Sequence, residues 1–398
     1  MMMDDKEIKI IEMLPLRKRL MNKSYLCYKF KRKGLSGLTI WIFSNLKIFI
    51  ARLLYPVLTV ISAFFFRTFR RKGKLSDKTL YAFYDLETSP ETYDFFTFLA
   101  LADMRRSGLG CENIHVLIVP GNDSGFKEGF FKYYDLKNKI WRLRNILIPG
   151  SWLLKSCTAV TACADRREAG TYFSIAKNIF PGTYSVALPV GETEWRYLLA
   201  QLKDGSPLPE FAASAQALEY VKSWINVHAN GKKVISITLR ESKYSPDRNS
   251  NLKAWCEFAR SLSEEYLPVL IRDTERAFET VPEDMEGLQV FNEAAWHLDL
   301  RAAFYMQSYL NLAINNGPTS LSYLLKDSRV LEFKLTTPTV MATTEEYIMK
   351  TVGIGPGDNP ILDDRVRLIW EDDNLDIIQR EFEKMIEDMN SKDASFNR

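Results

Sequence analysis

The chain has 398 residues, of which 46% are hydrophobic, and this length and composition exclude a disordered protein and leave room for two domains. The net charge of +3 is unevenly distributed. Residues 1–78 hold 18 Lys and Arg against 5 Asp and Glu, a net charge of +13, whereas residues 79–398 hold 35 basic and 45 acidic side chains, a net charge of −10. The basic segment suits an anionic partner, either nucleic acid or anionic lipid.

Two apolar runs, Leu35–Leu46 and Leu53–Phe66, lie in the basic segment and are separated by Lys47 and Arg52. The second run has 14 residues without charge, fewer than the ~20 that a simple membrane-spanning helix needs. Basic clusters flank the apolar stretch on both sides, and positive flanks favour the cytoplasmic face of a membrane. We therefore expect residues 34–74 to attach the chain to membrane lipid, as a segment that re-enters or lies in the interface.

The N-terminal segment also allows other interpretations. One is a conventional span through Leu38–Phe66, and another is an apolar hairpin buried against the rest of the chain. Nucleic-acid binding is disfavoured, because the basic residues frame apolar runs instead of an aromatic-studded groove. The expected location is therefore the membrane, with the body of the protein in the cytoplasm.

Metal, redox and several nucleotide sites are not expected. The five cysteines form no CxxC or CxxH pair, the three histidines are scattered, and no DxD triplet follows a predicted strand. We interpret the cysteines as reduced thiols of a cytosolic protein. The chain also lacks a GxxxxGK[ST] loop, a GxGxxG turn after its first strand and a GxSxG elbow, which disfavours P-loop enzymes, dinucleotide dehydrogenases and serine hydrolases.

Residues 79–205 alternate strand-like and helix-like patterns, which predicts an α/β domain with a Rossmann-like parallel sheet. Ser89 followed by Pro90 is typical of a helix start. The predicted strands are Leu80–Tyr84, Ile114–Val119, Ile146–Ile148 and Tyr184–Leu188, and the predicted helices run from Ser89 to about Arg106 and from about Ser151.

Residues 206–370 repeat the alternation and predict a second Rossmann-like domain, followed by an acidic helix and tail in residues 371–398. The boundary between the two domains is expected in residues 202–212 or in the Ala229–Lys233 turn, with a helix over Ala212–Val227 bridging them. The predicted strands are Val234–Thr238, Leu267–Ile271, Leu288–Phe291, Leu310–Ile314 and Val330–Phe333, and the predicted helices are Asn251–Leu262, Leu298–Leu310 and Thr319–Leu325.

The strongest local signal is Ala313–Leu325, with the sequence AINNGPTSLSYLL. A strand ends, a tight turn follows, and a helix opens with Thr319 and Ser320. A helix start offers free N–H groups and a positive dipole end, which suit phosphate, and Gly317 lets the backbone come close to a ligand. An ordinary, well-capped strand–turn–helix connection is the alternative.

The turn Asn316–Leu321 (NGPTSL) resembles the (D/N)-x-G-P-x-x-L turn of the GT-B glycosyltransferases, particularly the heptosyltransferase-like group. The resemblance covers about a dozen residues and, through the order of elements, extends loosely over the last 170. Ser320 stands where that family usually has His. The resemblance implies that Asn316, Gly317, Thr319 and Ser320 cradle the diphosphate of a nucleotide-sugar donor.

Basic residues follow the first two strands of the second half and face the expected cleft between the domains. Arg240 ends the first of these strands, and it resembles the diphosphate-contacting arginine at the same topological place in GT-B fucosyltransferases. The guanidinium fork is suited to a diphosphate because it donates two parallel hydrogen bonds. Lys243 and Arg248 in the next loop, and Arg272 after the following strand, are further donor-binding candidates, although scattered surface charges are the alternative.

A general base is the remaining requirement of an inverting glycosyl transfer. It should come from the N-terminal half, where Asp85 and Glu87 lie between the first strand and its helix. Loop solvation and helix capping are their other possible roles. GT-B enzymes generally need no bound metal, so no metal site and no cofactor beyond the nucleotide-sugar co-substrate are expected.

These features together predict a membrane-associated glycosyltransferase that uses a nucleotide-sugar donor and a lipid-linked or cell-envelope glycan acceptor. The first domain would bind the acceptor and the second the donor. A non-catalytic membrane-surface scaffold with a degenerate GT-B fold is one alternative. Another phosphate-handling enzyme of the membrane surface is a second alternative, and it would require an acid or metal cluster that the sequence does not show.

Overall fold

The computed structural model describes residues 75–122, 125–127, 135–274 and 276–396, with side chains as far as residue 391. These residues belong to one compact unit, Arg71–Arg398. The predicted membrane-attachment segment, residues 34–74, lies outside the described residues. Within the described part of the chain, the helices include none with the length and apolar character needed to cross a membrane.

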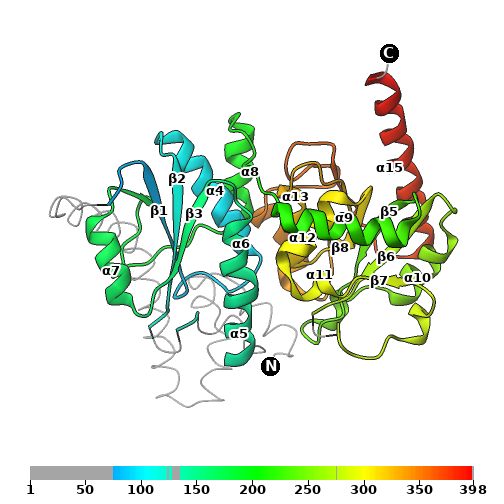
Figure 1. Cartoon of the computed structure of the whole chain (residues 1–398), viewed down its shortest axis with the longest axis horizontal. Helices are drawn as coiled ribbons and strands as arrows, with labels where there is room; N and C mark the ends of the chain where they lie inside the picture. The colour runs from blue at the N-terminus through cyan, green and yellow to red at the C-terminus, as the bar shows by residue number, and fades with distance from the viewer. Residues whose placement is uncertain (1–74, 123–124, 128–134, 275, 397–398) are drawn as a thin grey trace, which may run out of the picture. The chain divides into compact units, whose positions relative to one another are not determined.

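Four parallel strands form the first sheet, in the order β3-β2-β1-β4 (Figure 1). Successive side chains of β1 point to opposite faces, as in any strand, and they contribute to two separate apolar clusters. One cluster lies against α4 and the other against α7. The elements are β1 (Thr79–Asp85), α4 (Asp94–Gly108), β2 (Asn113–Val119), β3 (Cys157–Ala162), α7 (Arg166–Ile175) and β4 (Asn178–Phe180).

Two strands predicted in this half are wrong. Ile146–Ile148 lies in a continuous helical segment made of α5 (Leu136–Arg142), a π-helical turn (Leu143–Leu147) and α6 (Ile148–Trp152), and Tyr184–Leu188 is irregular. Three consecutive apolar residues fit a helix as well as a strand. The helix expected to begin at Ser151 instead ends there, because Ser151 lies in the last turn of α6.

The first helix begins later than predicted. It starts at Asp94, after Tyr93 as the N-terminal flanking residue, and not at Ser89–Pro90. The preceding loop is fixed by hydrogen bonds from the Ser89 backbone N–H to the Asp85 carbonyl at 2.8 Å and from the Tyr84 hydroxyl to the Pro90 carbonyl. The loop therefore carries Tyr93 and Asp94 away from the strand before the helix begins.

Six parallel strands form the second sheet, in the order β10-β9-β8-β5-β6-β7. Counted from β5, this is the Rossmann order 3-2-1-4-5-6, and it confirms the expected α/β class with two parallel sheets. The strands are β5 (Lys233–Thr238), β6 (Tyr266–Ile271), β7 (Gln289–Val290), β8 (Leu310–Ile314), β9 (Val330–Phe333) and β10 (Val366–Leu368). The sequence predicted all of these except β10.

Helices cover the second sheet and continue to the end of the chain (Figure 1). Helix α9 packs against α12 on one side, and α10 packs against α15 on the other. Helix α8 (Trp195–Lys203) packs against α4 of the first half. The helices of the second part are α9 (Ala215–Ala229), α10 (Leu252–Ser261), α11 (Glu293–Trp296), α12 (Leu298–Gln307), α13 (Gly317–Leu324), α14 (Glu345–Thr351) and α15 (Leu375–Phe396).

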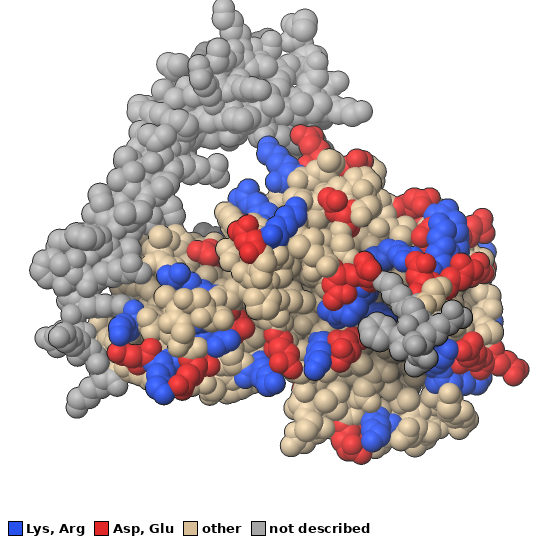
Figure 2. Space-filling model, turned by 90° about the horizontal axis from the view of Figure 1, so that it is seen from above, with Lys and Arg blue, Asp and Glu red and all other residues tan. Residues whose placement is uncertain are grey.

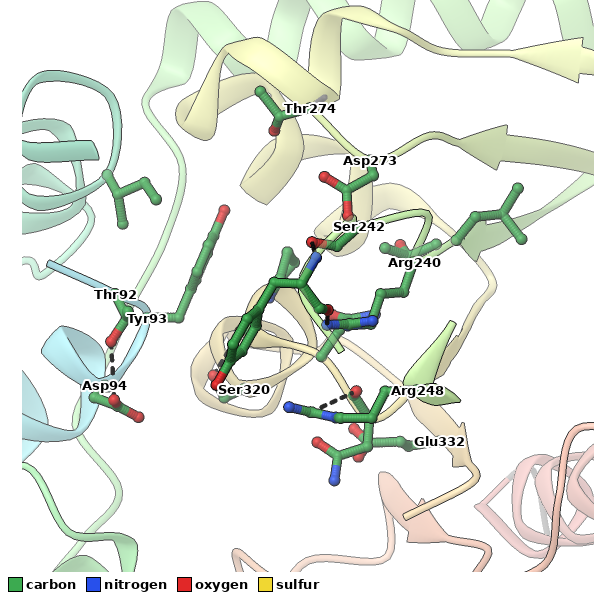
Figure 3. A pocket seen from close by; sticks show the side chains of 18 of the residues that line it. Thr92, Tyr93, Asp94, Arg240, Ser242, Arg248, Asp273, Thr274, Ser320 and Glu332 are labelled. Carbon is green, nitrogen blue, oxygen red and sulfur yellow. Dashed lines mark hydrogen bonds between the residues drawn. The ribbon is translucent and has the colours of Figure 1, made fainter. Parts of the chain in front are cut away.

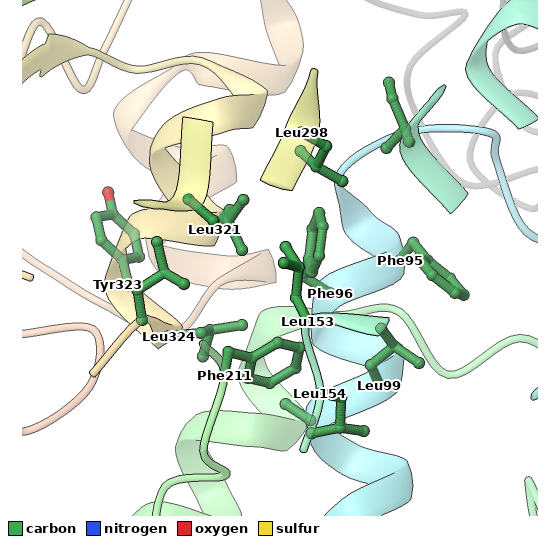
Figure 4. Close-up of a cluster of buried hydrophobic side chains, with 14 of the residues drawn as sticks. Phe95, Phe96, Leu99, Leu153, Leu154, Phe211, Leu298, Leu321, Tyr323 and Leu324 are labelled. Atoms are coloured by element: carbon green, nitrogen blue, oxygen red, sulfur yellow. The ribbon is translucent and has the colours of Figure 1, made fainter. Parts of the chain in front are cut away.

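One apolar core contains side chains from helices of both halves of the chain (Figure 4). Phe96 of α4 and Leu324 of α13 both belong to it, and Phe211 of the connecting segment forms β-bridges with Leu154 and Leu325. Burying each such Leu or Phe side chain contributes about 1.5–3 kcal/mol. This packing fixes where the start of α4 lies relative to the start of α13.

Basic and acidic side chains are interspersed on the face of the molecule in Figure 2. The described residues on that face show no continuous basic stripe of the kind that tracks a nucleic-acid backbone. This distribution agrees with the net negative charge of residues 79–398.

Candidate active site

A cleft of about 930 Å³ lies at the carboxyl ends of the strands of the second sheet, facing the start of α4 (Figure 3). Its walls come from the start of α4 and from α5 on one side, and from the loops after β5, β6 and β8 on the other. In the second sheet, β5 and β8 are neighbours at which the strand order reverses, and open parallel sheets bind ligands at that point. The volume is at the upper end of the range for small-molecule sites.

The turn after β8 opens into this cleft. Asn316 is the N-cap of α13, where its Oδ1 accepts hydrogen bonds from the Thr319 backbone N–H at 3.0 Å and the Thr319 hydroxyl at 2.8 Å. The Nδ2 group of Asn316 is buried and has no hydrogen-bond acceptor within the described residues. A buried amide without an acceptor is costly, so Nδ2 is an unsatisfied hydrogen-bond donor of this turn.

Thr319 and Ser320 have different places around this turn. The Thr319 side chain is buried and does not line the cleft, and its hydroxyl also contacts the Ile314 carbonyl at 3.3 Å. Ser320 lines the cleft, and its hydroxyl donates to the Gly317 carbonyl at 2.6 Å. Of the two predicted donor-binding hydroxyls, only that of Ser320 is therefore available to a ligand.

A glycine is needed at position 317 because the ring of Tyr93, from the first half of the chain, packs against it. A Cβ atom added at Gly317 would lie 2.8 Å from Cδ2 of Tyr93, which is closer than real Cβ contacts. The Tyr93 ring therefore packs directly on the turn, and it brings the start of α4 into contact with the start of α13. Burial raises the pKa of the Tyr93 hydroxyl, and the charge of Arg301 opposes this.

Asp94, the first residue of α4, lines the cleft (Figure 3). One carboxylate oxygen, Oδ2, accepts a hydrogen bond from the Thr92 hydroxyl at 2.8 Å. The side chain is exposed to the cleft while protein surrounds it on its other sides, so loss of bulk solvation raises the pKa of Asp94, against the hydrogen bond from Thr92 and the charge of Lys127. A cleft carboxylate with a raised pKa is suited to accepting a proton.

Asp85 and Glu87, the predicted bases, do not line the cleft. Asp85 is fully buried, and both its oxygens bind the Arg166 guanidinium at 2.9 Å, with the Tyr184 hydroxyl donating to Oδ2 at 2.8 Å. Glu87 accepts a hydrogen bond from the Asn122 backbone N–H at 2.7 Å. Both carboxylates hold loops together in this structure, and neither is placed to reach a substrate in the cleft.

The basic residues that follow β5 differ in what their side chains contact. Arg240 lines the cleft, but its guanidinium donates to the Ser245 and Tyr244 carbonyls and to Asn249 Oδ1. Arg248 also lines the cleft and donates to the Asn315 carbonyl at 3.2 Å. Lys243 is exposed outside it. Arg240 therefore shapes the 241–250 loop, and Arg248 contacts the turn after β8 through the Asn315 carbonyl.

Two further arginines line the cleft from the second half, and they differ in their partners. Arg272 is buried in a two-pronged ion pair with Glu241, at 2.8 and 3.1 Å. Arg301 on α12 is equally buried, but it donates only to the Ala294 carbonyl at 2.7 Å and the Tyr305 hydroxyl at 2.9 Å. The charge of Arg272 is thus neutralised within the protein.

An acid–phenol pair forms the floor of the cleft. Glu332 at the end of β9 and Tyr323 on α13 both line it, and the Tyr323 hydroxyl donates to Glu332 Oε2. Burial raises the pKa of the Glu332 carboxyl to about 8, against the hydrogen bond from Tyr323 and the charge of Arg248. At neutral pH the Glu332 side chain is therefore uncharged and does not repel an anionic ligand.

Aromatic side chains form one rim of the cleft. Trp141 of α5 and Trp296 of α11 meet edge to face with ring centroids 5.4 Å apart, and Phe278 packs on Trp296 at 4.9 Å. The Phe278 side chain is 78% exposed. Exposed rings beside a cleft offer an apolar surface to a second ligand.

Within the described residues, no cluster of three or more His, Cys, Asp or Glu side chains is placed to hold a metal ion. The four described cysteines are buried and unpaired. Burial raises the pKa of Cys157 to about 11 and of Cys163 to about 12, so both are thiols at neutral pH.

Tyr93, Asp94 and Arg301 are among the cleft residues that the sequence did not single out. Tyr93 and Asp94 follow the same strand as Asp85, but the expected helix start at Ser89 placed them inside a helix. Placing the helix start at Asp94 instead of Ser89 would have put Tyr93 and Asp94 at the end of the loop and made them candidates. Arg301 lies in the middle of a helix, and strand-end reasoning gives no signal for it.

Comparisons with known proteins concern the fold. No protein-family model and no curated protein sequence matches the chain. Among solved structures, it is similar to the E. coli ADP-heptose lps heptosyltransferase II, at 10% identity and a TM-score of 0.44, over 73% of this chain and 89% of that one.

Two other solved structures are similar at the same level. A glycosyl transferase family 9 protein from Veillonella parvula has 10% identity and a TM-score of 0.39, over 75% and 87% of the two chains. The E. coli heptosyltransferase WaaC with ADP has 13% identity and a TM-score of 0.36, over 77% and 99%. Function is therefore argued from the site itself.

Proposed function

We propose that the protein is a glycosyltransferase that moves a sugar from a nucleotide-sugar donor to an acceptor hydroxyl. One observation carries the proposal: the cleft has a carboxylate, Asp94, on one wall and an unsatisfied helix-start turn, Asn316–Ser320, on the other. Tyr93 joins the two walls by packing on Gly317. A proton acceptor and an anion-binding turn on opposite walls are what transfer from a sugar diphosphate requires.

The donor's diphosphate would lie against the start of α13. The free backbone N–H groups and the positive dipole end of this helix favour anionic oxygens, and the buried Nδ2 of Asn316 supplies another donor. Arg248 and Ser320 border the same region. The uncharged Glu332 side chain lets the diphosphate approach the floor of the cleft.

The chemical step would be a direct displacement at the anomeric carbon. The acceptor hydroxyl oxygen attacks that carbon while its proton passes to the Asp94 carboxylate. The bond from the anomeric carbon to the diphosphate oxygen breaks, and the nucleoside diphosphate leaves with the bonding electron pair. The raised pKa of Asp94 strengthens it as a base while leaving it ionised above that pKa.

The acceptor would be a lipid-linked or cell-envelope glycan. The aromatic rim of Trp141, Trp296 and Phe278 suits the apolar faces of sugar rings. The basic and apolar residues 34–74 would attach the protein to the cytoplasmic face of a membrane, where a lipid-borne acceptor is concentrated near the cleft.

Nucleotide binding tests the proposal. Thermal unfolding of the full chain in detergent would be followed with UDP, GDP, ADP and CMP, because a ligand at 100 times its Kd stabilises the folded state by about 2.7 kcal/mol. Asn316→Asp keeps the capping oxygen but replaces the Nδ2 donor by a negative oxygen, and it should abolish the shift. Asn230→Asp makes the same charge change at the end of α9, outside the cleft, and should preserve it.

A shift with one nucleotide that is lost only in Asn316→Asp supports a nucleotide-sugar enzyme and identifies its donor class. No shift with any nucleotide would contradict the proposal and would favour a non-catalytic scaffold.

Membrane attachment has its own test. The full chain should float with vesicles that contain anionic lipid and should bind neutral vesicles more weakly, because each Lys or Arg of the basic flanks adds about 1 kcal/mol near an anionic surface. Failure to float with either vesicle would overturn this part of the proposal without affecting the nucleotide site.

A further inference from the structure

Arg301 is a buried cation in the wall of the cleft. Its side chain belongs to α12, and the residue is 3% exposed. Within the described residues, no carboxylate forms an ion pair with it. Its hydrogen bonds go from Nε to the Ala294 carbonyl and from Nη1 to the Tyr305 hydroxyl, so three of the five guanidinium N–H donors remain for another acceptor.

Buried charges are normally paired, because desolvating a charge without a partner is costly. Two buried charged groups among the described residues follow this rule: Arg272 is paired with Glu241, and the Asp85 carboxylate is paired with Arg166. Arg301 has no carboxylate at ion-pair distance within the described residues, although the charge of Asp273 acts on it. Because Arg301 lines the cleft, a ligand there could supply the anion.

The position of Arg301 specifies which part of a ligand it would meet. Its helix, α12, packs against α13, and its charge acts on the hydroxyl of Tyr93. The Tyr93 ring in turn packs on Gly317 at the start of α13, and Asp94 follows Tyr93 in the chain. Arg301 therefore lies at the junction between the proposed base and the proposed diphosphate-binding turn.

We propose that Arg301 binds the diphosphate of the donor and stabilises the negative charge that grows on the leaving group as its bond to the anomeric carbon breaks. This inference rests on the proposed function. It replaces the expectation that Arg240 carries this charge, because the guanidinium group of Arg240 is held by Ser245, Tyr244 and Asn249. A fixed cation at the site of developing charge is an efficient form of electrostatic catalysis.

Calorimetric titration of three proteins tests the proposal: the wild type, Arg301→Gln and Arg301→Lys. Each would be titrated with the nucleoside diphosphate that binds the wild type and with the matching monophosphate. Loss of a charge-assisted contact should weaken diphosphate binding about tenfold to a hundredfold in Arg301→Gln. The monophosphate should be affected less, and Arg301→Lys should be intermediate because it keeps the charge without the planar fork.

Arg260→Gln is the matched control. Arg260 lies in the same half outside the cleft, and it also donates to two carbonyl oxygens, those of Asp284 and Glu286. Its replacement should leave diphosphate affinity unchanged.

The outcomes separate this inference from the proposed function. Wild-type affinity for the diphosphate in Arg301→Gln would mean that Arg301 only ties α12 to α11, and the nucleotide site would stand. Absence of nucleotide binding by the wild type would overturn both. Should Arg301→Gln fail to fold, Arg301→Lys decides, because an unchanged ratio of diphosphate to monophosphate affinity in that variant would overturn the role of the guanidinium fork.

Discussion

The segments that follow β1 and β8 begin alike and end differently. Each leaves a buried parallel strand with a polar residue at its carboxyl end and continues into a helix. After β1, the first carboxylate, Asp85, has both oxygens bound by Arg166, whereas Asp94 nine residues later opens to the cleft. After β8, Asn316 caps the helix with its Oδ1 atom, and its Nδ2 atom has no partner in the part of the chain that the structure describes.

This difference shows what separates a structural polar residue from a functional one here. Both kinds lie at strand ends and both are polar, so residue type and position do not distinguish them. The distinguishing property is whether the protein itself occupies the hydrogen-bonding groups of the side chain. The following variants test that distinction.

The largest effect on stability is expected for Asp85→Asn. Removing one partner of a buried ion pair leaves the Arg166 charge uncompensated and typically costs about 3–5 kcal/mol. Asp94→Asn is the matched variant, and because Asp94 forms one hydrogen bond at the cleft surface, its unfolding free energy should change by about 0.5 kcal/mol or less. Urea denaturation of both variants gives the comparison, and equal destabilisation would show that the two carboxylates do not differ in this way.

A smaller effect is expected for Gly317→Ala. The added methyl would meet the Tyr93 ring at 2.8 Å, and overpacking of this kind costs about 1–3 kcal/mol. The ring should be displaced from the turn, which would weaken both folding and nucleotide binding. Adding Tyr93→Ala should relieve the clash and restore most of the unfolding free energy. If Gly317→Ala is as stable as the wild type, the two walls of the cleft are not joined at this contact.

A further effect, spread over several pH units, is a pH dependence at Glu332. Its pKa in the folded protein is about 8, above the ordinary value of 4.5, so between these values the folded state holds a proton that the unfolded state has lost. Stability must therefore fall as pH rises through this window. Glu332→Gln removes this dependence, so its unfolding free energy relative to the wild type should rise by up to about 1.4 kcal/mol per pH unit from pH ~5 to ~8. Parallel pH profiles would contradict the assignment.

Strands with a compact apolar run could be predicted from the sequence, and β3, β4 and β10 could not. LYAFY in β1 and VISIT in β5 are buried on both faces, and continuous burial leaves a continuous apolar run. β3 is an edge strand with the sequence CTAVTA and is largely half-exposed, and β4 has three residues. Such strands form because a central neighbour supplies their hydrogen bonds, which is information the local sequence does not contain.

The turn of the candidate site could be predicted from the sequence, and the hydrogen-bonding state of the other site residues could not. The turn at Asn316–Ser320 is local, since strand end, turn residues and helix cap are consecutive in the chain. The state of Asp85 depends on Arg166, which lies 81 residues away, and the state of Arg272 depends on Glu241. Partners at this distance decide which polar groups remain open, so the sequence identified the region of the cleft but not Asp94 or Arg301.

The most direct test of Asp94 as the base is the release of nucleoside diphosphate from nucleotide-sugars by the wild type and by Asp94→Asn. The reaction would contain vesicles of the native membrane lipids, so that both water and a lipid-borne hydroxyl are available as acceptors, and the nucleoside diphosphate affinity of both proteins would be measured alongside. We predict release from one class of donor by the wild type and release about 10²–10⁴-fold slower by Asp94→Asn, at equal affinity. Equal rates of release by the two proteins would contradict the assignment of Asp94 as the base.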